Sequence, residues 1–362
     1  GHPGHAPPDE QAERDVGADH EEHGEQECVG RPERPSEPAR SHRGRSLAAR
    51  PVPLARIDSA AMVELPPLGA HVSAAGGAAA AIGRGVELGC TALQIFVKSP
   101  NQWRARPLPP AAAAEFRAAR AASPIGPVVA HAAYLINLAA PPGETRERSL
   151  AALADELGRG AALGLDALVV HPGAHLGAGA EAGLVRVAAA LDEVLAAVPA
   201  GAPRLLLEIT AGQGTVLGSR LEELARIIEL AACGERLGVC LDTCHAFAAG
   251  YPLHEAAGHE ALLAELDRLL GLARLGAIHL NDSQGVCGSR RDRHANIGEG
   301  EIGTAAFRRL LRDERLRRVP MLLETPLGDD GAGHARDLAT LRRLAGDVRL
   351  SGRGRRAARR AG

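Results

Sequence analysis

The rest of this 362-residue chain can be organised around one stretch, Leu237-Gly-Val-Cys-Leu-Asp-Thr-Cys-His245. Its apolar run from Leu237 to Leu241 is typical of a strand buried on both faces of a parallel sheet. The run stops at Asp242, and His245 follows three residues later. A carboxylate and an imidazole at the mouth of a buried strand suit a borderline metal such as zinc. A strand end capped by Asp242, with a histidine nearby, explains this stretch equally well.

Apolar runs of similar length recur on both sides of this strand. Together with it they occupy residues 66–72, 91–98, 126–134, 166–172, 204–210, 237–242, 276–281 and 320–325. Stretches with helical spacing separate most of them, for example Ser149–Leu163, Glu181–Val198, Gly218–Ala232 and His254–Leu272. Strands alternating with helices predict an α/β fold, a single-domain (β/α)8 TIM barrel over residues 65–348. A doubly wound open sheet is the second possibility, but no convincing G-x-G-x-x-G follows the first run.

The two ends of the chain differ from this alternating region. Residues 1–61 contain eight arginines and twelve acidic residues, are rich in Pro and Gly, and have no sustained apolar period. Such sequence buries too little surface to offset the entropy of ordering, so we expect a disordered extension. Met62 is the first methionine, and we expect it to be the physiological start. Residues 349–362 are predicted to form a short, flexible basic tail, and for it we favour solvated disorder over nonspecific contact with DNA phosphates.

The composition argues against several classes of protein. Hydrophobic residues make up 45% of the chain but aromatic residues only 2%, which predicts a core of leucine, valine and alanine. A formal net charge of −2 argues against a globally basic coat for nucleic acid, although it allows a local basic face. No apolar run approaches the roughly 18 residues of a membrane helix. The six cysteines form no C-x-x-C pair, so we expect reduced thiols in a cytoplasmic protein with no membrane partner.

Potential metal ligands follow the predicted strands at the end of the barrel where functional groups of this fold lie. The third to eighth strands end at or beside His131, His171, Glu208, Asp242, His279 and Glu324, and the following loops add His245, Asp292 and His294. The four carboxylates would repel one another in a partly desolvated site, and divalent cations remove that cost. Imidazoles with carboxylates point to zinc or manganese, and nine ligands imply two or three ions. Clustered divalent ions are typical of phosphate-ester hydrolysis.

Motifs along the chain resemble, in the right order, the endonuclease IV family of zinc-dependent apurinic/apyrimidinic endonucleases. They are Gly69-Ala-His-Val-Ser-Ala-Ala-Gly-Gly77, Tyr134-Leu-Ile-Asn-Leu138, His171-Pro-Gly173, Glu208-Ile-Thr-Ala-Gly-Gln-Gly214, Asp242-Thr-Cys-His-Ala-Phe-Ala-Ala-Gly-Tyr251, His279-Leu-Asn-Asp-Ser283, Asp292-Arg-His-Ala-Asn-Ile-Gly-Glu-Gly300 and Leu323-Glu-Thr325. The resemblance runs from Gly69 to Leu344. It is specific, because related sugar isomerases with the same barrel lack the Asp-Arg-His and Asp-Thr-Cys-His combination.

The resemblance implies three zinc ions per chain, with manganese as an alternative at one or more sites. It assigns ligands to the ions in three sets: His131, His171 and Glu208 for the first; Glu208, Asp242, His279 and Glu324 for the second; His245, Asp292 and His294 for the third. Glu208 bridges two ions in this assignment and is the expected catalytic residue. The spacing of Asp242 and His245 suggested one shared ion, but the resemblance assigns Asp242 to the second ion and His245 to the third.

The implied activity is that of a zinc-dependent phosphodiesterase, deoxyribonuclease IV, acting in base-excision repair. It cleaves the phosphodiester 5′ of an abasic site in duplex DNA and leaves a 3′-hydroxyl and a 5′-deoxyribose phosphate. The resemblance also implies DNA contacts from Lys98, Gln102, Trp103, Arg104 and Tyr134. Packing at the barrel rim is the alternative for Trp103 and Tyr134. No obligate protein partner is expected, and a monomer needs no further assumption.

Two other functions use the same residues differently. A divalent-metal sugar isomerase or epimerase on this barrel would use one or two ions and has no role for His245, Asp292 and His294 together. A DNA-binding module without catalysis would not need the complete set of nine ligand residues. The number of zinc ions per chain separates the nuclease from the isomerase.

Overall fold

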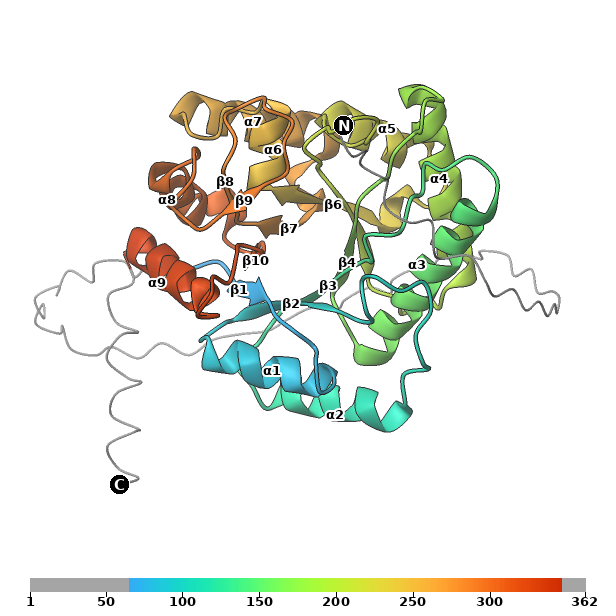
Figure 1. Ribbon diagram of the computed structural model, residues 1–362, viewed down its shortest axis with the longest axis horizontal. Helices are drawn as coiled ribbons and strands as arrows, with labels where there is room; N and C mark the ends of the chain where they lie inside the picture. The colour runs from blue at the N-terminus through green and yellow to red at the C-terminus, as the bar shows by residue number, and fades with distance from the viewer. Residues whose placement is uncertain (1–64, 347–362) are drawn as a thin grey trace, which may run out of the picture. The chain divides into compact units, whose positions relative to one another are not determined.

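Eight parallel strands close into a barrel in the computed structural model, which describes residues 65–346 (Figure 1). The strands are β1 (Leu68–His71), β2 (Ala92–Phe96), β3 (Val128–His131), β4 (Ala167–Val170), β5 (Arg204–Glu208), β6 (Leu237–Asp242), β7 (Leu275–His279) and β10 (Met321–Leu323). They are joined in the order β1-β10-β7-β6-β5-β4-β3-β2. Each lies inside or within one residue of an apolar run predicted from the sequence. The TIM barrel is therefore confirmed, and the doubly wound sheet is wrong.

Helices surround the barrel on the outside (Figure 1). They are α1 (Ala78–Glu87), α2 (Pro110–Ala121), α3 (Glu144–Leu163), α4 (Ala180–Ala197), α5 (Leu221–Leu230), α6 (Thr243–Ala249), α7 (Ala256–Leu270), α8 (Thr304–Arg312) and α9 (Gly333–Ala345). Three single turns of 3-10 helix precede strands, η1 (Gly234–Arg236), η2 (Leu272–Arg274) and η3 (Glu314–Leu316). Because each parallel strand needs a crossover back to the start of the next, the helices lie where the alternation predicted them.

Helix α6 is one element that the apolar pattern did not indicate. It begins at Thr243, directly after β6, and Asp242 is its N-cap residue. The Asp242 carboxylate accepts a hydrogen bond from the His245 amide at 2.7 Å. Since an N-cap carboxylate satisfies one of the free amides of the first turn, the same residue ends the strand and starts the helix. The spacing of Asp242 and His245 is thus also the spacing of a capped helix start.

Two layers of apolar side chains form the core because neighbouring residues of a strand point to opposite faces. Leu205 and Leu207 of β5 belong to the large cluster between barrel and helices. Leu206 belongs to a smaller cluster inside the barrel, whose other members are Ala92, Val129, Ala167, Val169, Cys240, Ala277 and Leu322. This interior is built from alanine, valine, leucine and cysteine, as the low aromatic content predicted. The next inward position of β5, above Leu206, is Glu208.

The segment between β7 and α8 contains a two-stranded antiparallel sheet. It pairs β8 (Asp282–Ser283) with β9 (His294–Ala295). The buried Asp282 carboxylate accepts hydrogen bonds from the amides of Gly298 and Ile302, at 2.9 Å each, and so holds the glycine-rich chain that follows β9. This small sheet brings Asp292 and His294 back over the mouth of the barrel.

Several sequence expectations lie outside the described residues. They are the disordered extension over residues 1–61, the start at Met62 and the basic tail over residues 349–362. Within residues 65–346, no helix is both long and apolar enough to cross a membrane. The cysteines of this part are unpaired, with Cys90, Cys240 and Cys244 buried.

Candidate metal centre

Polar side chains occupy the inward positions at the carboxyl end of the barrel, one strand after another. In several strands they come two residues after a member of the inner apolar layer, as Glu208 follows Leu206 and Asp242 follows Cys240. The period of two therefore places them in one layer above the barrel interior. The set comprises His71, Gln94, His131, His171, Glu208, Asp242, His279 and Glu324. The strand-end residues predicted as ligands all belong to this set.

Glu208 lies at the centre of the set and is completely buried. Its Oε2 is 3.1 Å from Nε2 of His131 and 3.0 Å from Nε2 of His171. Its Oε1 is 2.9 Å from Nδ1 of His279 and 3.3 Å from Nδ1 of His245. The two carboxylate oxygens thus face different groups of histidines, which is the arrangement of a carboxylate shared by two cations.

The potential ligand atoms gather into three groups, each with its atoms within 4.8 Å of one another. The groups are His131, His171 and Glu208; Glu208, Asp242, His279 and Glu324; and His245, Asp292 and His294. These are the three sets that the family resemblance assigned to three ions. Two further groups of this kind among residues 65–346 are Asp242, Cys244 and His294, and His259, Glu260 and Asp313. In the latter, Arg315 already pairs with Asp313 and Glu260.

In three of the histidines, a backbone carbonyl determines which ring nitrogen carries the hydrogen and which keeps its lone pair. Nδ1 of His131 donates to the Ala132 carbonyl at 2.7 Å, and Nδ1 of His245 donates to the Ile209 carbonyl at 2.9 Å. His294 likewise donates from Nδ1 to a main-chain carbonyl, at 3.2 Å. Because a neutral imidazole has one N–H and one lone pair, the lone pair of each ring is left on Nε2.

Each of these free nitrogens faces a carboxylate. Nε2 of His131 is 3.1 Å from Glu208, and the Nε2 atoms of His245 and His294 are 3.2 and 3.3 Å from the two oxygens of Asp292. Nε2 of His294 is buried and finds no hydrogen-bond partner among the described residues. A lone pair facing a carboxylate requires a cation between them, either a proton or a metal ion. Imidazole nitrogens and carboxylate oxygens are ligands of zinc, so the residues fit a zinc site.

Burial and charge act in opposite directions on the ionisation of these groups. Burial would raise the pKa of the Glu208 carboxyl, but the facing His279 and His171 lower that pKa well below its ordinary value. Burial would lower the pKa of the His245 imidazole, but the Asp242 carboxylate raises it well above its ordinary value. The pKa of His279 is raised in the same sense. In the metal-free protein these interactions favour an ionised Glu208 carboxylate and protonated imidazoles at His245 and His279.

Comparison with known proteins identifies the family. A family model described as a xylose isomerase-like TIM barrel matches residues 82–344. Among curated proteins, "Probable endonuclease 4" of Chloroflexus aurantiacus is 52% identical over 280 residues, which are 77% of this chain and 98% of that protein. The protein of the same name from Geobacter sulfurreducens is 49% identical over 277 residues, 76% of this chain and 94% of the relative. The chain belongs to the endonuclease IV family.

Solved structures agree with this assignment. The crystal structure of endonuclease IV from Thermus thermophilus has a TM-score of 0.69 and 44% identity, and the match covers 78% of this chain and 100% of that one. A D-tagatose 3-epimerase-like protein has a TM-score of 0.58 at 19% identity, which shows the shared fold alone. Membership of the endonuclease IV family makes this chain a hydrolase with endonuclease activity in DNA repair, and the sugar-epimerase alternative is set aside.

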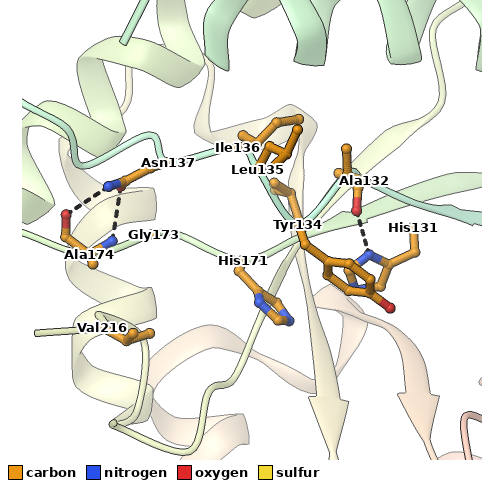
Figure 2. Close-up of a pocket in the computed structure, with 12 residues that line it drawn as sticks. His131, Ala132, Tyr134, Leu135, Ile136, Asn137, His171, Gly173, Ala174 and Val216 are labelled. Carbon is orange, nitrogen blue, oxygen red and sulfur yellow. Dashed lines mark hydrogen bonds between the residues drawn. The ribbon is translucent and has the colours of Figure 1, made fainter. Parts of the chain in front are cut away.

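A cavity of about 260 Å³ opens beside His131 and His171, in front of the endonuclease IV motif Tyr134-Leu-Ile-Asn-Leu138 (Figure 2). Asn137 holds its two walls together, because its Oδ1 accepts from the Ala174 amide at 2.9 Å and its Nδ2 donates to the Ala174 carbonyl at 3.1 Å. Gly173 must be a glycine there, since its φ is 100° and a Cβ would collide with Oδ1 of Asn137.

Tyr134 stands at the rim of this cavity with 61% of its surface exposed. Its ring lies 5.6 Å from that of His131 and 5.5 Å from that of Phe96, centre to centre. The Tyr134 ring thus packs beside two aromatic rings while most of its surface stays open to solvent. Packing at the rim therefore accounts for only part of its surface.

The loop after β2 carries the other residues predicted to bind DNA. Gln102 and Arg104 are exposed, whereas Trp103 is half-buried and packs against the main apolar core. The Lys98 side chain, in the same loop, is directed inward: it is only 1% exposed, and its Nζ is 3.3 Å from Oε1 of Glu156. Nζ of Lys98 also donates to the Trp103 carbonyl at 2.9 Å. Its charge thus faces a buried carboxylate of α3 and not the solvent, where a DNA phosphate would be.

The structure brings into contact with the predicted site residues several side chains that the sequence did not indicate. Gln94 and Glu156 are buried and contact predicted site residues, but neither belongs to a quoted motif. Asn281 lies inside the His279-Leu-Asn-Asp-Ser283 motif and was given no role; its Nδ2 donates to Oδ2 of Asp242 at 2.6 Å. The one available signal for Gln94 was a glutamine inside an otherwise apolar run, which is costly unless its amide is fully hydrogen-bonded.

Proposed function

We propose that this chain incises duplex DNA at the phosphodiester 5′ of an abasic site, leaving a 3′-hydroxyl and a 5′-deoxyribose phosphate. It does so with three zinc ions, manganese being the alternative at one or more positions. His131, His171 and Glu208 would hold the first ion, Glu208, Asp242, His279 and Glu324 the second, and His245, Asp292 and His294 the third. The observation that carries the proposal is the position of Glu208, whose two oxygens face two different ligand groups.

The chemistry can be divided between the ions and the protein. Bound zinc would supply Lewis-acid stabilisation of charge and activation of water, as clustered divalent ions do in phosphodiesterases. The protein holds Glu208 ionised, since its pKa is lowered well below the ordinary range despite its burial. An ionised carboxylate at the junction of two groups can orient the attacking water and accept its proton. Glu208 is accordingly the catalytic residue of the proposal.

The substrate would approach the carboxyl end of the barrel. Large apolar side chains are exposed on the loops after β3, β4, β7 and β10, namely Tyr134, Leu135, Leu176, Val286 and Leu327. We assign Tyr134 to the gap that an abasic nucleotide leaves in the base stack, because proteins that unstack DNA insert such side chains. Gln102, Trp103 and Arg104 would contact the strands from the loop after β2. Lys98 would support that loop from inside.

Incision of a duplex with a single abasic analogue is the direct test. We expect one cut, 5′ of the analogue, with about three zinc atoms per chain by elemental analysis and loss of activity on prolonged treatment with a chelator. A matched duplex without the lesion is the control. One zinc per chain together with turnover of a ketose, and no incision, would favour a sugar isomerase instead.

Three further assignments belong to the proposal. The repair unit comprises residues 65–348, the enzyme acts as a monomer without an obligate protein partner, and it works in the cytoplasm. Light scattering at the concentrations used for activity tests the monomeric state. A dimer whose dissociation abolishes incision would require revision of that assignment.

A further inference from the structure

Gln94 is a buried amide in the layer of predicted ligands. It lies in β2, is fully buried, and pairs in register with His71 of β1. Its Nε2 is 2.6 Å from Oε1 of Glu324, and its Oε1 is 2.9 Å from Nε2 of His279. Both of these partners belong to the group proposed for the second zinc. Gln94 itself is a poor candidate for a zinc ligand, since amide oxygens are ligands of harder cations.

The direction of these hydrogen bonds follows from the chemistry of the partners. An ionised carboxylate such as Glu324 can only accept, so the amide group that faces it must be the NH2 of Gln94. The amide oxygen of Gln94 is then turned to Nε2 of His279 and can only accept as well. His279 must therefore carry its hydrogen on Nε2. In the neutral ring that zinc requires, the lone pair is then on Nδ1.

Nδ1 of His279 is the atom that faces the carboxylates. It is 2.9 Å from Oε1 of Glu208, 3.2 Å from Oε2 of Glu324 and 3.7 Å from Oδ2 of Asp242. His131, His245 and His294 have the opposite arrangement, with hydrogen on Nδ1 and lone pair on Nε2. In those three rings a backbone carbonyl is the partner. For His279, the same function is performed by the side chain of Gln94.

We propose that Gln94 is a positioning residue that sets the tautomer of His279 and, through it, the ligand nitrogen offered to the second zinc. The inference rests on the ligand sets proposed above. Partners that orient ligating histidines change metal affinity by about 10- to 100-fold when they are removed. Gln94 contacts ligands of the second group only, and His131, His245 and His294 are oriented by the main chain. Substitution of Gln94 should therefore weaken the binding of the second ion and leave that of the other two unchanged.

Gln94→Met is the first test, since methionine has a similar length and offers neither a hydrogen nor a strong acceptor to His279. In zinc-loaded protein titrated with a competing chelator, we expect one of the three ions to be released at about 10- to 100-fold lower chelator activity than in the wild type. Thr210→Val is the matched control. The buried Thr210 hydroxyl lies at the same end of the barrel and donates to the Leu217 carbonyl at 2.9 Å, not to a predicted ligand.

The tautomer of His279 can also be measured directly in the wild-type protein, so this second test does not require the Gln94→Met variant to fold. In zinc-loaded wild-type protein with ¹⁵N-labelled histidine, long-range ¹H–¹⁵N spectra should show His279 protonated on Nε2. His131, His245 and His294 should be protonated on Nδ1, with signals assigned by single histidine substitutions. A Nδ1-protonated His279, or wild-type chelator sensitivity of all ions in Gln94→Met, would overturn the inference. A wild-type protein that binds no zinc would instead refute the proposed ligand sets.

Discussion

Lys98 and Glu156 form a buried ion pair, with Nζ 3.3 Å from Oε1 and each side chain only 1% exposed. Glu156 also accepts from the Ala133 amide, at 3.3 Å to Oε1 and 3.2 Å to Oε2. Lys98 in turn donates to the carbonyl of Trp103. One carboxylate of α3 therefore joins the loop after β2 to the loop that presents Tyr134. The two loops proposed to enter DNA are held at a fixed spacing by this pair.

Substitution of Lys98 by methionine should lower the free energy of unfolding. Burial raises the pKa of Glu156 even with Lys98 beside it, so removal of the lysine leaves an uncompensated buried carboxyl. Breaking one side of a buried pair costs about 3–5 kcal/mol, and replacing both sides by apolar residues restores most of it. Denaturant unfolding should thus show a large loss in Lys98→Met and recovery in Lys98→Met/Glu156→Leu. Arg104→Ala, at an exposed position of the same loop, should leave stability within about 0.5 kcal/mol.

The same variants distinguish support of the loop from contact with phosphate. Loss of one phosphate contact reduces the slope of log K for DNA binding against log salt concentration by about one. We expect this reduction for Arg104→Ala. Lys98→Met should weaken binding of abasic duplex without changing that salt dependence. A reduced salt dependence with unchanged stability in Lys98→Met would show that Lys98 contacts the DNA backbone after all.

Glu208→Gln should abolish incision while the barrel remains folded. Glutamine keeps the shape of the side chain but loses the charge that two ligand groups share, and it turns an NH2 toward histidine lone pairs or zinc. We expect activity to fall by a factor of about 1,000 or more, with fewer than three zinc atoms per chain and an unchanged circular-dichroism spectrum. Retained activity with full zinc content would refute the bridging role.

Tyr134→Ala should weaken binding of the lesion without affecting stability. The side chain is 61% exposed, so its truncation removes little buried contact. Loss of an aromatic stacking platform costs about 1–3 kcal/mol, or roughly 5- to 150-fold in Kd. Fluorescence anisotropy with an abasic duplex measures this change, and Tyr134→Phe should retain wild-type affinity. An equal loss of affinity for undamaged duplex would argue against a role in reading the lesion.

Zinc binding should release protons. Burial lowers the pKa of His131, but the facing carboxylates raise it above its ordinary value. The pKa values of His245 and His279 lie well above the ordinary value. The raised pKa values favour the protonated rings in the metal-free protein, whereas zinc requires the rings to be neutral. Affinity should therefore rise as pH rises toward these raised pKa values and fall as pH drops. Calorimetry in buffers of different ionisation enthalpy should detect more than one proton released per chain; proton-neutral binding would contradict this.

Local sequence patterns were sufficient to predict much of this protein. Apolar runs predicted the eight strands, because a strand buried on both faces consists mainly of apolar residues. Residues such as Glu208 and His279 could be assigned to one end of the barrel, since parallel strands all point their carboxyl ends the same way. The start of α6 at Thr243 was not predicted, because a ligand and an N-cap residue give the same local signal, a carboxylate after an apolar run.

The order of motifs indicated the family, and the strand-end positions of the candidate ligands indicated the end of the barrel where they lie, before any contact was known. Gln94, Glu156 and the burial of Lys98 were decided only by the tertiary structure. Gln94 meets His279 across 185 positions of sequence, and Glu156 of α3 meets Lys98 in the loop after β2. A hydrogen-bond direction depends on which donor and acceptor share the space, and closure of the barrel determines that. No local pattern of apolar and polar residues predicts the direction of such a hydrogen bond.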